Sequence, residues 1–451
     1  MSLNSIMNTS LSGMNYARTA LETTSHNTVN VNTPGYSRQK VDVTTMPGTH
    51  MSYGILGSGT LVTGIRRQTD QMLISQYRDQ QSILAGYDQM DLTLQNVETI
   101  FGSVDNNHMG KALNDFFTSW SDLASPPVND STRPAVISTA RTLVADIQST
   151  HAQLADLESA LNDQMIDQVG TLNNMLDGVA ELNRQILASE SHQVTANDLR
   201  DQRDELLVAI SAITKADVME REDGTVDVAI GGRTMVSRDM ASSLSIIKDP
   251  ASGTLRVTPE GSRDEIALSD GSLAGLVMAR DTQVCDARES LDELAADLIQ
   301  QVNELHRQGR STGGSGLNFF TGEGAADIGV STALADDPTL IAISRSGLAG
   351  DTDLAREIAD LSLAAPDGGK SVVARYDTLV VDLASSVSAV RFQCETQAQV
   401  VDSVATRLES VRGVNTDEEA ANLMRYQNAY EAAARVVQVV QQMFDTLLNM
   451  V

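Results

Sequence analysis

The clearest hydrophobic pattern in the sequence lies at its C-terminal end. Apolar side chains recur there every seven residues, and a second set follows at the same period three positions later. This spacing is the heptad pattern of a helix that packs lengthwise against another helix. We call this set the C-terminal heptad row, and it consists of Leu423, Tyr426, Tyr430, Ala433, Val437, Val440, Phe444, Leu447 and Val451.

The start of this C-terminal helix is also marked in the sequence. Asn415 and Thr416 are residues that can cap free amide groups. The three acidic residues that follow, 417–419, place negative charge at the positive end of the helix dipole. We therefore expect a helix from about residue 415 to the last residue.

The N-terminal end carries a weaker row of the same kind, with Thr28 as its last member. This helix is predicted to stop at residues 32–35, Asn-Thr-Pro-Gly, because proline disfavours helix at the preceding residue and Pro-Gly suits the middle of a type II turn. A helix with one apolar stripe is unstable alone in water, so we expect the two terminal helices to pair as a coiled coil. The candidate residues at this end are Met7, Met14, Leu21, Asn32, Pro34, Gly35 and Tyr36.

Between the two ends, long helical stretches alternate with strand-like runs. Val- and Thr-rich runs at 36–46 and 55–65, around glycine-rich turns, predict a β-hairpin or extended arm. Short alternating runs separated by glycine and proline, from 215 to about 269, predict a small inserted β domain. Residues 309–350 are expected to form a loop or a short irregular region. Helical periodicity predicts helices at about 66–101, 109–124, 134–188, 195–214, 277–305 and 380–413.

The predicted fold class is mainly α with an inserted β domain, and we expect three domains. The first is a terminal coiled coil of 1–40 with 415–451, which we expect to be disordered in the unassembled monomer. The second is a helical rod with a β-hairpin arm, made of 41–214 with 271–309 and 351–414. The third is the β-rich inserted domain of 215–270, with 310–350 as a candidate addition.

Composition and charge narrow the possible functions. The chain has 60 acidic and 32 basic side chains, a formal net charge of −28, and its few lysines are scattered singly. Such a chain does not suit binding to nucleic acid or to an anionic membrane surface. Its N-terminus lacks a conventional secretory signal and no stretch approaches eighteen apolar residues, so we expect no membrane insertion.

Catalytic and metal-binding chemistry is not indicated. The six histidines are dispersed without helical pairing, so no metal site is predicted. The acidic clusters at 201–205 and 417–419 are interpreted as solvated helix faces and caps. Cys394 occupies an apolar heptad position and is expected to be a small core residue, whereas Cys285 flanks its helix's row. No nucleophile, base and oxyanion donor come together, so we predict neither an enzyme nor a cofactor.

Two end motifs resemble those of the bacterial flagellar axial family, which comprises rod, hook and hook-associated proteins. The first is residues 25–39, Ser-His-Asn-Thr-Val-Asn-Val-Asn-Thr-Pro-Gly-Tyr-Ser-Arg-Gln, and the second runs from Asn415 to Ala434. The resemblance extends inside the chain through 197–207 and the helix at 291–309. Taken together, the sequence is most similar to the hook-associated members of this family.

The resemblance implies a structural role without catalysis. Such a subunit is exported through the flagellar type III apparatus and is extracellular, in a ring of copies of itself between hook and filament. The implied partners are the hook protein, a second junction protein on the filament side, and a cytosolic export chaperone that holds the C-terminal segment. The chain is shorter than larger members of the family, so we expect only one inserted β domain.

Three alternatives stay open at the sequence level. The C-terminal heptad row could be buried in the core of its own chain, as in any helical bundle. The chain could be another axial subunit, from the hook or the distal rod, because the Asn-Thr-Pro-Gly turn is shared among them. It could also be a type III-secreted coiled-coil protein, which would have no reason to carry both end motifs.

Overall fold

The computed structural model describes residues 3–51, 54–102, 108–125, 130–190, 195–249, 254–311, 314–348, 350–363 and 369–449. The predicted end of the C-terminal helix at 450–451, and with it Val451 of the heptad row, lies outside these residues. The chain divides into two compact units. Unit 1 comprises 1–84, 169–271 and 397–451, and unit 2 comprises 85–168 and 272–396.

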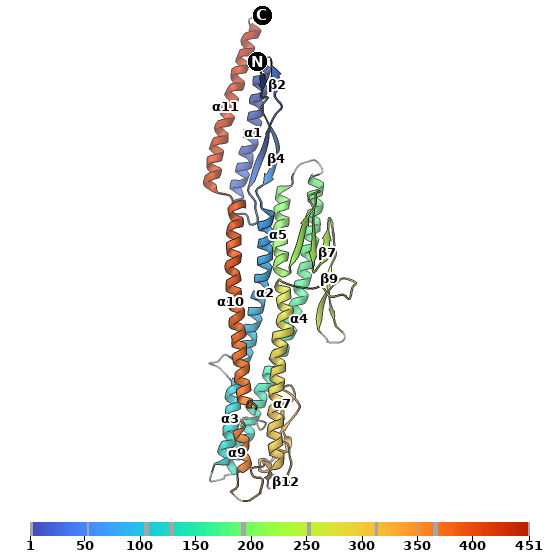
Figure 1. The fold of residues 1–451 in the computed structure, drawn as a ribbon, viewed down its shortest axis with the longest axis vertical. Coiled ribbons are helices and arrows are strands. Elements are labelled where there is room, and N and C mark those ends of the chain that lie inside the picture. Colours follow the sequence, from blue (N-terminus) through green and yellow to red (C-terminus); the bar gives the residue numbers. More distant parts are fainter. Residues whose placement is uncertain are drawn as a thin grey trace. The chain divides into compact units, whose positions relative to one another are not determined.

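Unit 1 is organised around the two terminal helices, which pack side by side (Figure 1). These are α1 (Leu3–Val29) and α11 (Thr416–Asn449). The pair is antiparallel, because Tyr16 meets Tyr426 with ring centroids 5.9 Å apart while Asn27, further along α1, meets Glu419, nearer the start of α11. The predicted pairing of the terminal helices is therefore present in the folded chain.

A β-hairpin arm follows α1 in the sequence and packs against it. Its long strands are β1 (Gln39–Thr45) and β4 (Thr60–Arg67), antiparallel with a bulge between Asp42 and Val43. The short strands β2 (Thr49–Met51) and β3 (Gly54–Leu56) pair near the tip of the hairpin. The predicted arm is confirmed, with its second long strand a few residues later than expected.

The helix after the arm, α2 (Gln71–Phe101), begins later than the predicted residue 66. Residues 66 and 67 belong to β4, and the helix starts where Asp70 provides a cap. The Asp70 carboxylate accepts hydrogen bonds from the amides of Met72 (2.9 Å) and Leu73 (3.2 Å). A side chain that satisfies two free amides fixes the start of the helix at this point.

The inserted β region also belongs to unit 1 and is anchored by a helix. Strands β5 (Ala216–Glu220), β6 (Val226–Ile230), β7 (Arg233–Ser237) and β8 (Met240–Ala241) form an antiparallel sheet in sequence order, and β9 (Leu244–Lys248) pairs with β10 (Leu255–Pro259). Asn183 of α4 (Arg133–Glu190) is buried, and its amide donates to the carbonyls of Val226 (2.8 Å) and Arg238 (2.6 Å). The helix α5 (Asn197–Ile213) precedes the sheet.

Unit 2 has an aromatic core that periodicity alone did not indicate. Trp120 and Phe116 of α3 (His108–Ala124) are fully buried, and both contact Phe319. Asn303 of α7 (Cys285–Gln308) holds the 319–320 segment, accepting hydrogen bonds from both amides at 2.7 and 2.8 Å. Part of the predicted irregular region 309–350 is thus core.

The remaining elements of unit 2 are short, apart from the last long helix. They are α6 (Ser272–Met278), a π-helical turn (Ala279–Val284), β11 (Arg310–Ser311), β12 (Gly314–Ser315), β13 (Phe320–Thr321), β14 (Gly329–Val330), α8 (Thr332–Asp336) and α9 (Asp353–Asp360). Two short 3-10 turns, Asp130–Thr132 and Pro338–Leu340, complete the described elements. The long helix α10 (Val372–Arg412) ends one residue before Gly413, as predicted.

The expectation that Cys394 is a core residue is wrong. Its side chain is only partly buried, and its thiol donates to the carboxylate of Asp88 at 2.7 Å. Burial and the nearby carboxylates raise the pKa of this thiol to about 12. Cys394 does occupy a heptad position, but α10 presents it to a polar side chain of α2. Cys285 is exposed. The mainly α fold class with a small β region is confirmed.

Candidate assembly site

The predicted turn after α1 has the expected geometry. The Tyr36 amide donates to the Thr33 carbonyl at 3.3 Å, which closes a turn with Pro34 and Gly35 in its middle. Gly35 has φ +75°, the left-handed conformation that a type II turn requires at this position. A Cβ atom added to Gly35 would lie 3.3 Å from Cβ of Glu205, so the turn also packs closely against α5.

Asn27 links this turn to both neighbouring elements. It is 2% exposed and makes four hydrogen bonds. Its carbonyl oxygen accepts from the Tyr36 hydroxyl (2.7 Å) and the Gln39 amide (2.9 Å). Its amide nitrogen donates to the Gln39 carbonyl (2.9 Å) and to a carboxylate oxygen of Glu419 (3.2 Å). One buried side chain therefore connects α1, β1 and α11.

An ion pair completes this connection. Arg38 lies 2.6 Å from the carboxylate of Glu419 and donates to Glu418 at 2.9 Å. The interpretation of 417–419 as solvated acids is wrong for Glu419, which is 1% exposed. The cap itself is confirmed, since the Asn415 side chain accepts from the amide of Asp417 at 2.9 Å. We call the set Asn27, Tyr36, Arg38, Gln39 and Glu419 the polar junction.

A second buried ionic group ties the same segment to α5. Arg67 of β4 lies 2.7 Å from Asp201 and 2.8 Å from Asp204, and the Ser37 amide donates to Asp201 at 3.1 Å. The prediction that 201–205 is a solvated face is therefore wrong for Asp201, because β4 of the arm covers it. Asn197, also on α5, donates to the Ile65 carbonyl at 2.9 Å.

Burial shifts the ionisation of these groups. It raises the pKa of Asp201 despite the nearby Arg67. Burial opposes the charge of Arg67, but Asp204 and Asp201 outweigh it and raise the pKa of that guanidinium. Burial and the charges of Asp198, Asp201 and Glu419 hold the pKa of Tyr36 far above its usual range. Tyr36 is therefore a neutral hydrogen-bond donor over the physiological pH range.

The predicted heptad rows are only partly covered within the chain. Val440 is 2% exposed, whereas Tyr430 is 36% and Leu447 is 53% exposed. The other described members, Leu423, Tyr426, Ala433, Val437 and Phe444, are half-buried. At the N-terminal end, Met7, Met14, Leu21, Gly35 and Tyr36 are half-buried, and Asn32 and Pro34 are exposed. The structure thus brings the two ends together but leaves apolar surface free on both.

Sequence reasoning identified the ends but missed the polar junction. The missing members are Asn27, Arg38, Gln39 and Glu419. The signal that could have found the second ionic group was the spacing of Asn197, Asp201 and Asp204, which places three polar side chains on one face of a helix. The counter-charge was the adjacent pair of arginines at 66–67 on the arm.

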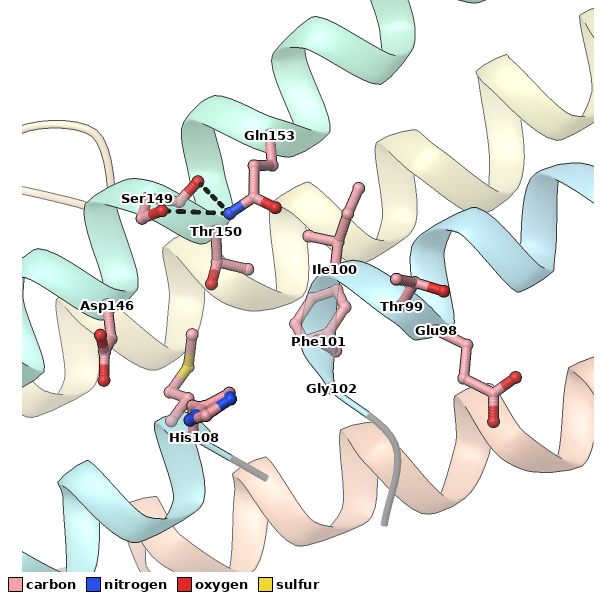
Figure 2. Close-up of a pocket in the computed structure, with 11 residues that line it drawn as sticks. Glu98, Thr99, Ile100, Phe101, Gly102, His108, Asp146, Ser149, Thr150 and Gln153 are labelled. Carbon is pink, nitrogen blue, oxygen red and sulfur yellow. Dashed lines mark hydrogen bonds between the residues drawn. The ribbon is translucent and has the colours of Figure 1, made fainter. Parts of the chain in front are cut away.

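A separate cavity lies in unit 2, where the end of α2 and the start of α3 approach α4 (Figure 2). It has a volume of about 520 Å³. Gln153 points along the α4 side of this cavity and donates to Ser149. Burial raises the pKa of Asp146, and His108 opposes this shift. The residues that line the cavity carry carboxylates, hydroxyls, an amide and one imidazole, with no Lys or Arg to bind an anion.

None of the helices in the described part of the chain combines the length and apolar character needed to cross a membrane. Within the same residues, no three His, Cys, Asp or Glu side chains are grouped so that they could hold a metal ion.

Known families match both the interior and the ends of the chain. The model described as "Flagellar hook-associated protein FlgK helical domain" matches residues 94–320, which is half of the 451 residues. "Flagellar basal body rod FlgEFG protein C-terminal" matches 407–450, and "Flagella basal body rod protein" matches 7–36. The two end matches are therefore shared with rod proteins, whereas the interior match is specific to the hook-associated protein.

Individual relatives agree with the interior match. The flagellar hook-associated protein 1 of Salmonella typhimurium is 26% identical, with 99% of this chain and 100% of the relative covered. That of Bacillus subtilis is also 26% identical, with 95% of each covered. The solved structure of the flagellar hook junction protein FlgK from Burkholderia pseudomallei has a TM-score of 0.67 at 14% identity, covering 75% of this chain and 100% of that one. This last similarity is one of fold.

Proposed function

This chain belongs to the flagellar hook-associated protein FlgK family, and from that premise we propose that it is a structural subunit of the junction between flagellar hook and filament. The single observation that carries this proposal is the interior match at 94–320, because the end motifs alone would also fit a rod protein. A hook or distal-rod subunit is the alternative that this match disfavours.

The polar junction supports assembly through the chain ends. It joins the turn motif of the N-terminal end to the first turn of α11 through Asn27 and the Arg38–Glu419 pair. The partly exposed heptad rows leave apolar surface available for neighbouring subunits. Residues 1–40 with 415–451 therefore act as the assembly domain.

Export and chaperone binding are finer parts of the proposal. The chain leaves the cell through the flagellar type III apparatus, and a cytosolic chaperone holds the C-terminal heptad row in an apolar groove until then. Val437 and Phe444 are half-buried in the folded chain, so a chaperone that binds them takes the place of α1. The acidic charge of −28 helps to keep unassembled copies soluble.

The chaperone step has its own test. Replacing Val437 and Phe444 together with Asp should abolish co-purification of the chaperone, whereas replacing the exposed Gln438 and Gln442 with Asp should not. Unchanged binding of the first double variant would place the recognised segment elsewhere in the chain.

The function itself is tested by electron microscopy of a deletion strain. We expect hooks without filaments and filament protein in the medium, and both should be corrected by the intact gene. Normal filaments in the deletion strain would contradict the junction role. Loss of the hooks as well would indicate a rod or hook subunit instead.

A further inference from the structure

The arm has a strand edge that no other strand of the described residues covers. Strand β4 pairs with β1 alone, in a two-stranded sheet. The backbone N–H and C=O groups of successive residues point alternately to the two sides of a strand, so every second residue of β4 directs these groups away from β1. We call the side of β4 that faces away from β1 the outer edge.

Two helices of unit 1 cap this outer edge at separate points. The Thr60 amide donates to the hydroxyl of Ser12 on α1 at 3.2 Å, and the Ile65 carbonyl accepts from the side chain of Asn197 on α5 at 2.9 Å. These contacts show that the backbone groups of both strand residues face outward. Val62 follows Thr60 by two residues, so its backbone groups face outward as well. Between the two caps, the outer edge is open to pairing with an added strand.

A cavity of about 610 Å³ adjoins this open stretch, and we call it the edge groove. It is lined by 62–65 of β4, the start of α5, the end of α4 and one residue of α1. Val62, Ile65 and Leu199 contribute half-buried apolar side chains. Residues 62–65 span about 10 Å in an extended strand. The edge groove therefore has room for three or four residues of another extended segment beside β4.

The polar groups at the α5 end of the edge groove are hydrogen-bond acceptors. Asn197 is 7% exposed, and its Oδ1 atom is buried without a hydrogen-bond partner among the described residues. Asp198 follows it with a side chain that is 61% exposed. Its carboxylate accepts from the side chain of Gln39 at 2.8 Å, and its ionic partner within the described chain is His26 at 3.7 Å. This end of the groove thus lacks a donor and a permanent positive charge.

The sequence motif at 197–207 singles out the same residue. Asp201 and Asp204 of this motif pair with Arg67, and Arg200 pairs with a carboxylate of α4 at 2.8 Å. Contacts within the chain therefore account for these charged side chains. The carboxylate of Asp198 lines the edge groove instead and has no Lys or Arg partner in the part of the chain that the structure describes.

These features select an extended, positively charged partner. Backbone pairing with an open strand edge accepts many extended sequences, so the side chains around the edge provide the specificity. Asp198 and the Oδ1 atom of Asn197 both require N–H donors, which a guanidinium or ammonium group supplies. A second copy of this chain fits less well, because copies with a net charge of −28 repel each other.

We propose that the edge groove binds an extended segment of a polypeptide other than this chain. The backbone of that segment pairs with the outer edge of β4 at Val62, and an Arg or Lys side chain of the segment pairs with Asp198. The inference rests on the proposed function in one respect, because the partner is sought in assembled flagella. It assigns a contact surface to the arm and α5, separate from the terminal helices.

The first test identifies what lies in the groove. Ser189, exposed at its rim, is replaced by the photo-reactive residue p-benzoylphenylalanine, and purified flagella are irradiated. We expect an adduct with a different flagellar polypeptide, in which mass spectrometry places an Arg or Lys within about three residues of the attachment point. The matched control carries the same photo-reactive residue in place of Gln185, which is exposed on the same helix outside the groove, and should give roughly tenfold less adduct.

A pair of glycines on the arm tests whether the groove itself is occupied. A Cβ atom added to Gly64, which lines the groove, or to Gly57, which does not, meets nothing within 4 Å. Both Gly64→Val and Gly57→Val should therefore leave the thermal unfolding of the subunit unchanged. Because the first variant fills the space beside β4, we expect it to lower the yield of the Ser189 adduct roughly tenfold relative to the second.

A charge exchange tests the ionic contact. Asp198→Arg should lower the yield of the same adduct roughly tenfold, and replacing the captured Arg or Lys with Asp should restore it. Asp217→Arg, at an exposed acidic residue outside the groove, should have no effect.

Several results would overturn the inference. They are an adduct with a second copy or within one chain, a captured segment without Arg or Lys, no adduct, an undiminished adduct in Gly64→Val, and a charge exchange that restores nothing. Each of them leaves the proposed function standing. Absence of the unmodified chain from flagella would instead contradict the proposed function.

Discussion

At the residue scale, the polar junction gives a reason for the buried polar groups between α1 and α11, two helices that pack mainly through apolar side chains. Most of the buried side chains of α1 are small (Ala17, Ala20, Thr23 and Thr24), so apolar packing alone would allow α1 to slide along α11. Three of the hydrogen bonds of Asn27 hold its side chain against Tyr36 and Gln39, and the fourth reaches Glu419 of α11 in only one alignment of the two helices. A buried polar residue of this kind fixes register at some cost in stability.

Removing the Asn27 amide should therefore weaken docking of the two ends. Asn27→Ala removes the hydrogen bond that crosses to the buried carboxylate of Glu419, and a hydrogen bond to a charged group contributes about 1.5–3 kcal/mol. That loss corresponds to a decrease of roughly 10- to 160-fold in the docking equilibrium. We therefore expect a smaller fraction of the secreted Asn27→Ala subunit to be incorporated into flagella. The control is Asn15→Ala, an exposed asparagine on the same helix, and equal incorporation of the two variants would contradict this role.

His306 makes the stability of unit 2 depend on pH. Its Nδ1 donates to the Leu317 carbonyl at 2.7 Å, and its Nε2 accepts from the Ala342 amide at 3.0 Å, so the ring is neutral in the folded state. Burial lowers its pKa below 6.5, and the hydrogen bond to Leu317 opposes that shift. The unfolded chain therefore binds the proton more readily than the folded chain does.

The sign of the effect follows from this difference. Above about pH 6.5, His306 is unprotonated in both the folded and the unfolded state. Below that pH the unfolded state binds the proton first, so the free energy of unfolding falls by up to about 1.4 kcal/mol per pH unit until the pKa of the folded state is reached. Lowering the pH from 7.5 to 5 should therefore lower the melting temperature of the wild-type protein more than that of His306→Gln, as measured by thermal unfolding. The half-buried His151, changed to Gln, serves as the control. Equal pH dependence of all three proteins would contradict the assignment.

At the element scale, close packing of α6 against α2 depends on a glycine. A Cβ atom added to Gly275 would lie 2.5 Å from the Gly86 carbonyl oxygen and 3.1 Å from Cβ of Gln89. Because the first of these is a backbone atom, Gly275→Ala should destabilise unit 2 by about 1–3 kcal/mol. Gly170→Ala in α4 meets open space and should stabilise by about 0.5–1 kcal/mol. Chemical denaturation measures both, and a neutral Gly275→Ala would show that the helices shift freely.

The long elements were predictable because each carries its own local signal. Heptad periodicity located α4, α10 and α11, and proline with glycine located the turn at 33–36. The aromatic core around Phe319 was not predictable, because it joins segments nearly 200 residues apart and has no period. The polar junction was missed for the same reason, since Asn27 and Glu419 are separated by 392 residues and each looks like a surface residue in its local context.

The terminal elements should differ in stability from the interior. Their heptad rows are only partly covered by their own chain, so residues 1–40 and 415–451 are expected to exchange amide hydrogens quickly and to be trimmed by protease in the purified monomer. The core around Trp120, which is fully buried, provides the internal comparison. Protection of α11 equal to that of α3 in the monomer would favour a helix stably buried in its own chain.

At the scale of the whole molecule, one turn sets the direction in which α1 leaves the arm. Gly35 has φ +75°, where a β-branched residue is strongly disfavoured, and the Glu205 side chain lies close to it on α5. Gly35→Val should displace α1 from the polar junction. The aromatic core of unit 2 and the β sheet do not depend on this turn, so the variant should still fold there.

The consequence should appear at assembly and not at synthesis or export. We expect Gly35→Val to be secreted in normal amount but to accumulate outside the cell without forming junctions, measured by comparing secreted with flagellum-bound protein. Gly54→Val, at a glycine with φ +139° on the arm and open space around it, strains the backbone without disturbing the junction and serves as the control. The competing possibility is that the motif serves export alone. Retention of the Gly35→Val variant inside the cell, together with normal assembly when it is added from outside to hooks that lack the subunit, would support export and reject the assembly role of the turn.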